Sequence, residues 1–467
     1  MARPKQAVVV IHGIGEQRPM DTLRGFVEAV LPDTIESSKS KYRNKPDRMS
    51  ESFELRCLQA PSNKGLGRPI TDFYEYYWAH HMRGSSYSAV VTWLFDLLRR
   101  PPWQIPAALR PLYYLSYVCL LTAAAILVWG LLAQPENKSL VASILTLYER
   151  KQFYFALLVL GLQWIGSYFL LSYVADAARY LTPSPDNIDE RNKIRAEGIK
   201  LLRALHESKK YFRIIIVGHS LGSVIAYDII RHLWVDMRRP RNPHPMKQEK
   251  AKEFDQVIEK LFPENEAAGT SKASAVELFQ QAQHALWHEH RSASIPWLVT
   301  DFITLGAPLA HSSLLMADNP ESFEQRKIEF EYPCCPPVSV QETHYLESYL
   351  VAEQPHPISV RIPHHGAPFS TTRWANLYFP YSKMLLGDLI GGPLHGVFGK
   401  GIRDVAVRPS NEGALQRTLY SHVCYWKKPT SANTSRKWEA GCADTITALQ
   451  SALRLECLRS KEQWPEP

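Results

Sequence analysis

The first eighty residues alternate between short apolar runs and a helical pattern. Residues 7–11 form a compact β-branched run that is typical of a buried strand. Apolar side chains then recur at helical spacing over residues 21–31, and residues 52–59 and 71–78 have strand-like composition. This β-α-β-β order predicts an α/β sheet.

The second half of the chain continues this alternation. The same patterns predict helices over residues 189–209 and 223–235, strands over residues 212–217, 297–305 and 373–379, and a helical tail after residue 440. Residues 236–292 are polar, rich in Lys, Glu and Gln, and helical in pattern, so we expect an insertion that lies over the sheet. The expected fold class is α/β, with a mostly parallel sheet flanked by helices.

Two long apolar runs interrupt the pattern. Residues 112–132 and 153–174 carry no charged side chain, and a polar link joins them. Each run is long enough to cross a hydrocarbon core as a helix, which takes about 20 residues. A very apolar core hairpin or lid is the alternative. The sequence therefore predicts a two-helix transmembrane hairpin at residues 111–175, which divides the remaining domain into residues 1–110 and 176–467.

Composition changes this picture little. The chain has 467 residues, of which 45% are hydrophobic, and a formal net charge of +8. No Lys/Arg run is dense enough to indicate nucleic-acid binding. The seven cysteines are scattered, without Cys-x-x-Cys pairs or zinc-finger spacing, so we expect neither a disulfide framework nor a metal or other cofactor.

The strongest chemical signal is Gly-His-Ser-Leu-Gly at residues 218–222. A mostly β-branched run precedes it and a helix-forming stretch follows. In that context the sequence is typical of a sharp strand-to-helix turn that presents a nucleophilic serine. The glycines remove side chains that would collide where strand and helix come close. We therefore expect Ser220 to be the nucleophile, and the N–H of Leu221 to donate to the oxyanion.

This turn resembles the nucleophile elbow of lipases and esterases of the α/β-hydrolase superfamily. Residues 8–17 (Val-Val-Val-Ile-His-Gly-Ile-Gly-Glu-Gln) look like the oxyanion-loop strand of those enzymes. Together with residues 73–78 and 304–309, they resemble a group of bacterial lipase-like membrane hydrolases. The resemblance covers most of the chain outside the apolar runs and the polar insertion. It implies the α/β-hydrolase fold and serine-hydrolase chemistry.

The resemblance also implies a second oxyanion donor in the loop after the first strand. The amide of Ile14 is the first candidate, with Gly13 and Gly15 as neighbours, and His12 is expected to brace the loop. A Gly-rich turn without this role is the alternative.

Hydrolases of this fold place the base late in the chain, after the acid. His422, near the C-terminus, is the expected base, and His395 is the alternative. His364 and His365 fit less well because they precede the strand expected at residues 373–379.

Asp388 is the expected acid, since its loop resembles the Asp-centred loop of the family. Residues 381–387 lengthen the usual connection between strand and acid. Asp404 lies further downstream and Asp301 lies within an earlier strand, so neither is a better candidate.

These residues predict a membrane-anchored serine hydrolase that cleaves acyl esters, with lipids as possible substrates, through a Ser-His-Asp triad and an acyl-enzyme. The candidates flank the apolar runs on both sides, so both flanks must share one compartment and the number of crossings must be even. Residues 7–11 are too short for a signal core, which places the catalytic domain on the cytoplasmic side of the inner membrane. A catalytically idle membrane scaffold and an acyltransferase are the alternatives.

Basic residues near the apolar runs bear on this orientation in two ways. Arg99, Arg100, Arg110 and Arg179 flank the runs and agree with the positive-inside tendency, whereas Lys138, Arg150 and Lys151 in the link weaken it.

Overall fold

The computed structural model describes the chain in segments. These are residues 5–13, 18–31, 40–82, 99–105, 110, 113–114, 117–118, 121–122, 125, 180–181, 187–263, 273–317, 319–338, 342–351, 354–381, 386–409, 418–427 and 442–456. The chain divides into two compact units. The larger comprises Met1–Arg83 and Ser184–Pro467, and the smaller is Gly84–Pro183.

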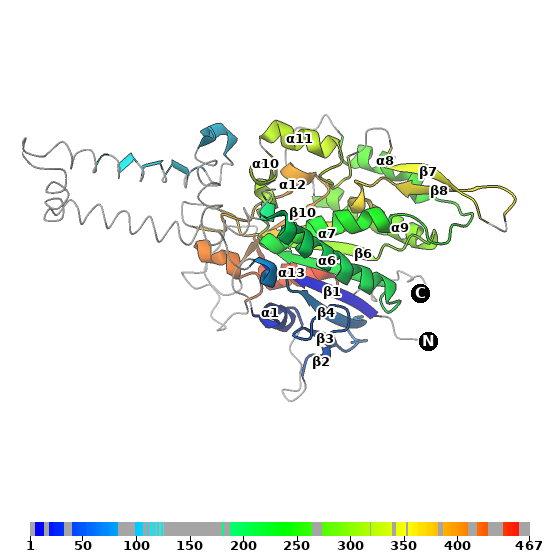
Figure 1. The fold of residues 1–467 in the computed structure, drawn as a ribbon, viewed down its shortest axis with the longest axis horizontal. Helices are drawn as coiled ribbons and strands as arrows, with labels where there is room; N and C mark the ends of the chain where they lie inside the picture. The colour runs from blue at the N-terminus through cyan, green and yellow to red at the C-terminus, as the bar shows by residue number, and fades with distance from the viewer. Residues whose placement is uncertain are drawn as a thin grey trace, which may run out of the picture. The chain divides into compact units, whose positions relative to one another are not determined.

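A nine-stranded sheet forms the centre of the larger unit (Figure 1). Its strand order is β11-β10-β9-β6-β5-β1-β4-β3-β2. All neighbours from β11 to β4 pair in parallel, and only β3 and β2 add in antiparallel fashion at one edge. The strands are β1 Lys5–Ile11, β2 Arg43–Pro46, β3 Arg56–Ala60, β4 Ile70–Tyr76, β5 Arg213–His219, β6 Val299–Leu305, β9 Arg373–Tyr378, β10 Arg403–Arg408 and β11 Ala443–Asp444.

Helices cover both faces of this sheet, which makes three layers. The helices α1 (Asp21–Val30) and α13 (Thr445–Leu453) contact each other and share one apolar core with side chains from the strands. On the other face, α7 (Leu221–Met237) contacts β5 and β1, and α6 (Ile188–Glu207) lies against α7 (Figure 1). Because successive side chains of a strand point to opposite faces, alternate residues of each buried strand feed the two cores.

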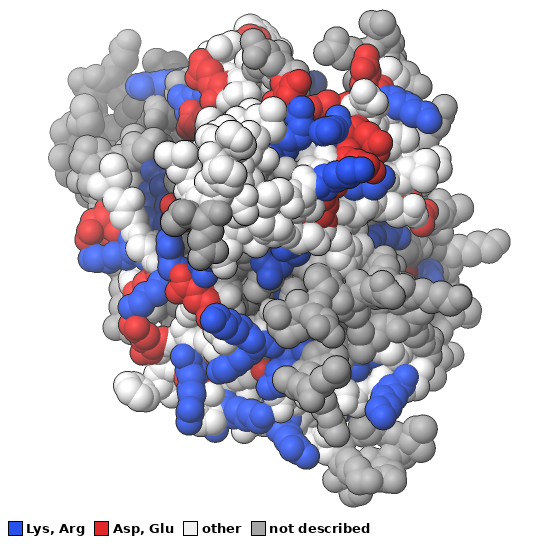
Figure 2. Space-filling view, turned by 90° about the vertical axis from the view of Figure 1, so that its right-hand side faces the viewer, with Lys and Arg blue, Asp and Glu red and all other residues white. Residues whose placement is uncertain are grey.

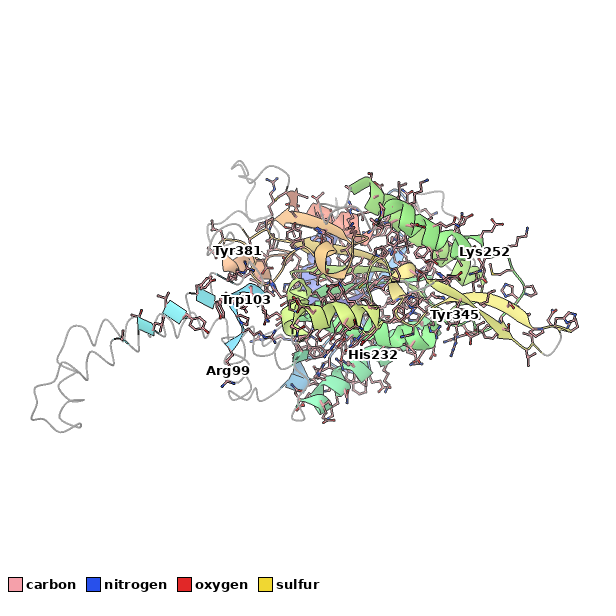
Figure 3. The ribbon with its side chains drawn as sticks, turned by 90° about the horizontal axis from the view of Figure 1, so that it is seen from above. Arg99, Trp103, His232, Lys252, Tyr345 and Tyr381 are labelled. Atoms are coloured by element: carbon pink, nitrogen blue, oxygen red, sulfur yellow. The ribbon has the colours of Figure 1, made fainter. Side chains whose placement is uncertain are left out.

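The remaining elements surround this frame. They are α8 Glu249–Leu261, α9 Ala273–Ser292, α10 Ser312–Leu315, α11 Pro320–Ile328, α12 His395–Phe398, the hairpin of β7 His344–Tyr349 and β8 Ile358–Pro363, and the short 3₁₀ turns η1 Ala79–Met82, η2 Pro102–Gln104, η3 Pro308–His311, η4 Pro368–Ser370 and η6 Leu419–Val423. Figure 3 shows Lys252 on α8 and Tyr345 on β7. The segment predicted as a polar insertion, residues 236–292, holds α8 and α9, and α9 contacts β9 and β10.

The predicted two-helix transmembrane hairpin is a point of correction. In the part of the chain that the structure describes, no helix is long and apolar enough to cross a membrane. Most of residues 111–175 lie outside the described residues. Hydropathy records only which side chains follow one another, and does not establish that they form one continuous helix. The fold class is therefore corrected to an α/β sheet flanked by helices.

The smaller unit has a few described contacts of its own. The Arg110 guanidinium donates to the carbonyl of Ile105, and the Tyr113 hydroxyl donates to the carbonyl of Arg100. Trp103, labelled in Figure 3, is 76% exposed. These contacts are local in sequence, within about a dozen residues.

On the face of the molecule seen in Figure 2, acidic and basic side chains of the described residues lie among uncharged ones. Several form ion pairs across neighbouring elements, such as Arg203–Asp236 at 2.6 Å and Arg241–Glu207 at 3.3 Å. Such solvent-exposed pairs contribute only about 0–1 kcal/mol each, so they carry little of the fold's stability.

Candidate active site

Five adjacent strands deliver the candidate residues to one edge of the sheet. In the order β10-β9-β6-β5-β1, the strands lead to His422, Asp388, Gly306, Ser220 and Gly13. The strands are parallel, so their carboxyl ends lie together. The strands β2 to β4 extend the sheet on one side of β1, and the strands from β5 onward extend it on the other side, so the strand order reverses at β1. Such a reversal opens a crevice at the carboxyl ends of the strands, where open α/β sheets bind ligands.

Ser220 occupies a strained turn between β5 and α7. Its backbone has φ 52° and ψ −129°, a conformation that residues other than glycine rarely adopt. A Cβ at Gly222 would lie 2.2 Å from the carbonyl oxygen of Ile11, and one at Gly218 would lie 2.5 Å from Cα of Ser223. The Ser220 N–H donates to the Leu305 carbonyl at 2.9 Å. Both glycines are thus required by close packing, as the sequence predicted.

The side chains of Ser220, His422 and Asp388 meet in a linear hydrogen-bonded relay. His422 Nε2 lies 2.8 Å from Ser220 Oγ, and His422 Nδ1 lies 2.8 Å from Asp388 Oδ2. An ionised carboxylate only accepts, so the Nδ1–H of His422 donates to Asp388 and Nε2 is left to accept the serine proton. All three side chains are buried. This is the geometry that nucleophile and base need for proton transfer.

The Asp388 carboxylate is held in its charged form by several donors. The Tyr425 hydroxyl donates to Oδ2 at 2.9 Å, and the N–H of Ile390 donates to Oδ1 at 2.8 Å. Burial by itself raises the pKa of Asp388, but nearby His422 and the backbone N–H groups of Ile390 and Gly391 outweigh it and bring the pKa below its ordinary value. The residues that lengthen the connection from β9, which include Tyr381 (labelled in Figure 3), do not prevent Asp388 from reaching His422.

The alternative base and an alternative acid pair with each other elsewhere. His395 Nδ1 lies 2.7 Å from Asp404 Oδ2, and the Asp404 carboxylate also accepts hydrogen bonds from the backbone N–H groups of Leu394 and His395. Asp301 bonds Arg373 near the amino end of β6, and His364 packs on Phe330. None of these candidates contacts Ser220 in the described residues.

The candidate oxyanion donors are only partly described. Leu221 is the first residue of α7. In the first turn of a helix the backbone N–H groups have no helical carbonyl to donate to, and the helix dipole favours negative charge there. Gly13 lies so close to the turn that a Cβ would be 2.8 Å from Ser220 Cβ. Ile14 and Gly15 lie outside the described residues. The second donor therefore stays a prediction.

His12 fixes the end of β1 beside this turn. Burial lowers the pKa of His12 to about 4, so the ring is neutral near pH 7. Its Nδ1 lies 2.8 Å from the Gly13 carbonyl oxygen, which accepts from the ring N–H. The ring stacks on Trp78 with centroids 5.2 Å apart, and the Trp78 indole donates to the His12 carbonyl at 2.9 Å.

Sequence reasoning gave no role to two residues that position the relay. His219 Nε2 lies 2.9 Å from the backbone carbonyl of His422, and burial lowers the pKa of His219 to about 3. The neutral ring therefore donates to that carbonyl and orients the His422 segment. Tyr425, three residues after His422, holds Asp388. The signal available in the sequence was their adjacency to Ser220 and His422.

Gly306 is a third such residue, at the end of β6. Its φ is +56°, and an added Cβ would lie 2.7 Å from Tyr425 Cε2, 2.8 Å from Asp388 Oδ2 and 3.1 Å from His422 Cε1. A side chain here would displace the acid and the base together.

We expect Gly306→Ala to lower kcat/KM for an acyl ester by at least about 100-fold, because a displacement of about 1 Å costs that much in a positioned site. The matched control is Gly396→Ala in α12, where an added Cβ meets nothing within 4 Å. Equal activities of the two variants, measured on the purified proteins, would show that Gly306 does not constrain the relay.

Comparison with family models, with curated proteins and with solved structures finds no match to this chain. The chemistry of the site must therefore be inferred from its own geometry.

Proposed function

We propose that this chain is a serine hydrolase that cleaves carboxylic (acyl) esters through an acyl-enzyme. The observation that carries the proposal is the relay from Ser220 Oγ through His422 to Asp388, with two successive separations of 2.8 Å. A membrane anchor is not included, because no described helix is long and apolar enough to cross a membrane.

The proposed reaction follows from the roles these atoms can take. His422 Nε2 removes the Ser220 proton as the oxygen attacks the ester carbonyl, and Asp388 stabilises the imidazolium that forms. The Leu221 amide donates to the oxyanion. His422 then protonates the leaving alcohol, and the acyl group stays on Ser220 Oγ. Water, which gives a proton to the same imidazole, then attacks the acyl-enzyme. The bond between the acyl carbon and Ser220 Oγ breaks, His422 returns the proton to Oγ, and the acid is released.

The position of the nucleophile favours an active enzyme over a catalytically idle fold. A strained backbone such as that at Ser220 costs about 1–3 kcal/mol and persists only where the surroundings impose it. The buried carboxylate, imidazole and hydroxyl would add further cost unless each had its partner. An idle scaffold gains nothing from maintaining all of these features together.

A fluorophosphonate probe tests the proposal directly, because it reacts only with an activated serine. We expect one probe per chain, attached to Ser220 and identified by mass spectrometry of the digested protein. Ser220→Ala should not label, whereas Ser348→Ala, which changes a serine on the β7–β8 hairpin, should label as the wild type does. A folded wild-type protein that does not react would identify the chain as an idle fold.

A further inference from the structure

Two adjacent histidines and a glutamate from another element lie together away from the relay. His80 and His81 belong to η1, which follows β4, and Glu197 lies in the middle of α6. His81 Nε2 is 2.8 Å from Glu197 Oε2, and His80 Nε2 is 3.7 Å from the same oxygen. All three potential ligand atoms lie within 4.8 Å of one another.

These separations suit a single metal ion. Imidazole nitrogens and carboxylate oxygens bind Zn²⁺ at about 2.0–2.2 Å, so two tetrahedral ligand atoms lie about 3.4 Å apart. The observed separations of 2.8 Å and 3.7 Å lie on either side of that value. Shifts of less than about 1 Å would therefore bring His80, His81 and Glu197 around one ion, with water in the remaining position.

The surroundings hold two of the three groups in place. The His80 ring stacks on Tyr77 with centroids 5.8 Å apart and an interplanar angle of 11°. Next to Glu197, Gly198 packs so closely that an added Cβ would lie 2.2 Å from Ile229 Cδ1. Glu197 and His80 are about half exposed, so an ion can reach them from solvent.

The chain positions of these residues give such an ion a structural role. The unit Gly84–Pro183 begins two residues after η1 and ends shortly before α6. The two histidines and the glutamate thus belong to the chain segments that lead into and out of this unit. An ion bound to all three would join the two segments, and closing so long a loop removes conformational entropy from the unfolded chain.

We propose that His80, His81 and Glu197 bind one divalent transition-metal ion of the Zn²⁺ type, which fastens the two segments flanking residues 84–183 to each other. A His81–Glu197 ion pair alone accounts for two of the three residues. His80 adds a third ligand atom on the same side of Glu197, since its Nε2 lies 3.7 Å from the same carboxylate oxygen. Nitrogen ligands favour Zn²⁺ over Mg²⁺ and Ca²⁺, which prefer oxygen.

The test uses the full-length protein, stripped with EDTA and dialysed into metal-free buffer. On addition of ZnCl₂ we expect one tightly bound Zn²⁺ per chain by mass spectrometric metal analysis, and a higher Tm that Mg²⁺ does not reproduce. His81→Ala and Glu197→Gln should each raise the Kd for Zn²⁺ by at least about 100-fold and abolish the Tm increase.

Matched controls separate this site from the other histidines of the chain. Glu207→Gln changes an exposed, ion-paired glutamate on the same helix, and His244→Ala changes an exposed histidine; both should bind Zn²⁺ as the wild type does. The Tm of each metal-free variant shows whether that variant folds. If His81→Ala does not fold, Glu197→Gln still tests the site, because glutamine has nearly the same size as glutamate. Unchanged Zn²⁺ binding in Glu197→Gln, or no retained Zn²⁺ in the wild type, would overturn the proposal.

Discussion

Replacing Ser220 by alanine is expected to lower kcat for hydrolysis of a short-chain p-nitrophenyl ester by about 10⁶-fold, the loss found when a serine hydrolase loses its nucleophile. The reason is that Ser220 Oγ is the attacking atom of the proposed reaction and lies 2.8 Å from His422 Nε2, the atom that takes its proton. Alanine removes only one oxygen from a buried turn, so the protein should still fold. Single-turnover and steady-state kinetics of the purified variant measure the effect.

The other members of the relay should behave as one unit with Ser220. His422→Ala is expected to lose as much activity as Ser220→Ala, and the double variant should lose no more than either single one. Asp388→Asn should cost about 10⁴-fold, since it spoils the tautomer of His422 and leaves the nucleophile in place.

His395→Ala supplies the matched control for these kinetics. His395 pairs with Asp404 and does not contact Ser220 in the described residues, so its loss should leave kcat near the wild-type value. A large loss in His395→Ala combined with an active His422→Ala would show that the wrong histidine was chosen as the base.

The sequence predicted those features of the site that are encoded locally. The turn at Ser220 depends on residues 218–222, which supply the glycines, the nucleophile and the start of a helix within one short stretch. The positions of His422 and Asp388 followed from chain order in the family that the sequence resembles. Their meeting at Ser220 could be expected, but only the three-dimensional structure supplies the separations.

The features that the sequence did not predict arise from contacts between distant segments. Gly306 has no local reason to be glycine, because the atoms that exclude a Cβ belong to Asp388, His422 and Tyr425, at least eighty residues away. The strand β10 was also missed. It is short and partly exposed, so its pattern of burial is weak. Its place in the sheet is set by pairing with β9, which a single-sequence pattern does not contain.

A buried ionic network joins the amino ends of β1, β5, β6 and β9, at the edge of the sheet opposite Ser220. Asp301 accepts two bonds from Arg373, at 2.9 Å and 3.0 Å, and lies 3.6 Å from Arg213. Arg213 in turn donates to Gln6 on β1 and to the backbone carbonyl of Arg454. The network thus links β1, β5, β6 and β9 with the end of α13.

Asp301→Asn is expected to lower the free energy of unfolding by about 3–5 kcal/mol near pH 7, because it leaves two buried guanidinium groups without their counter-charge. Urea titration followed by tryptophan fluorescence measures the change. Asp236→Asn is the matched control: it breaks an exposed pair with Arg203 and should cost less than about 1 kcal/mol.

The pH dependence distinguishes lost charge from lost packing in Asp301→Asn. Burial raises the pKa of Asp301, but the charges of Arg373 and Arg213 outweigh it and bring the pKa well below its ordinary value. A carboxyl group with a lowered pKa in the folded state stabilises the protein above its ordinary pKa of about 3.9, and this stabilisation is lost as the pH falls toward the folded-state pKa. The difference in unfolding free energy between wild type and Asp301→Asn should therefore be constant from about pH 6 to 8 and shrink below about pH 4. A difference that stays the same in acid would mean that the network stabilises the sheet by shape and hydrogen bonding, with no contribution from the charge of Asp301.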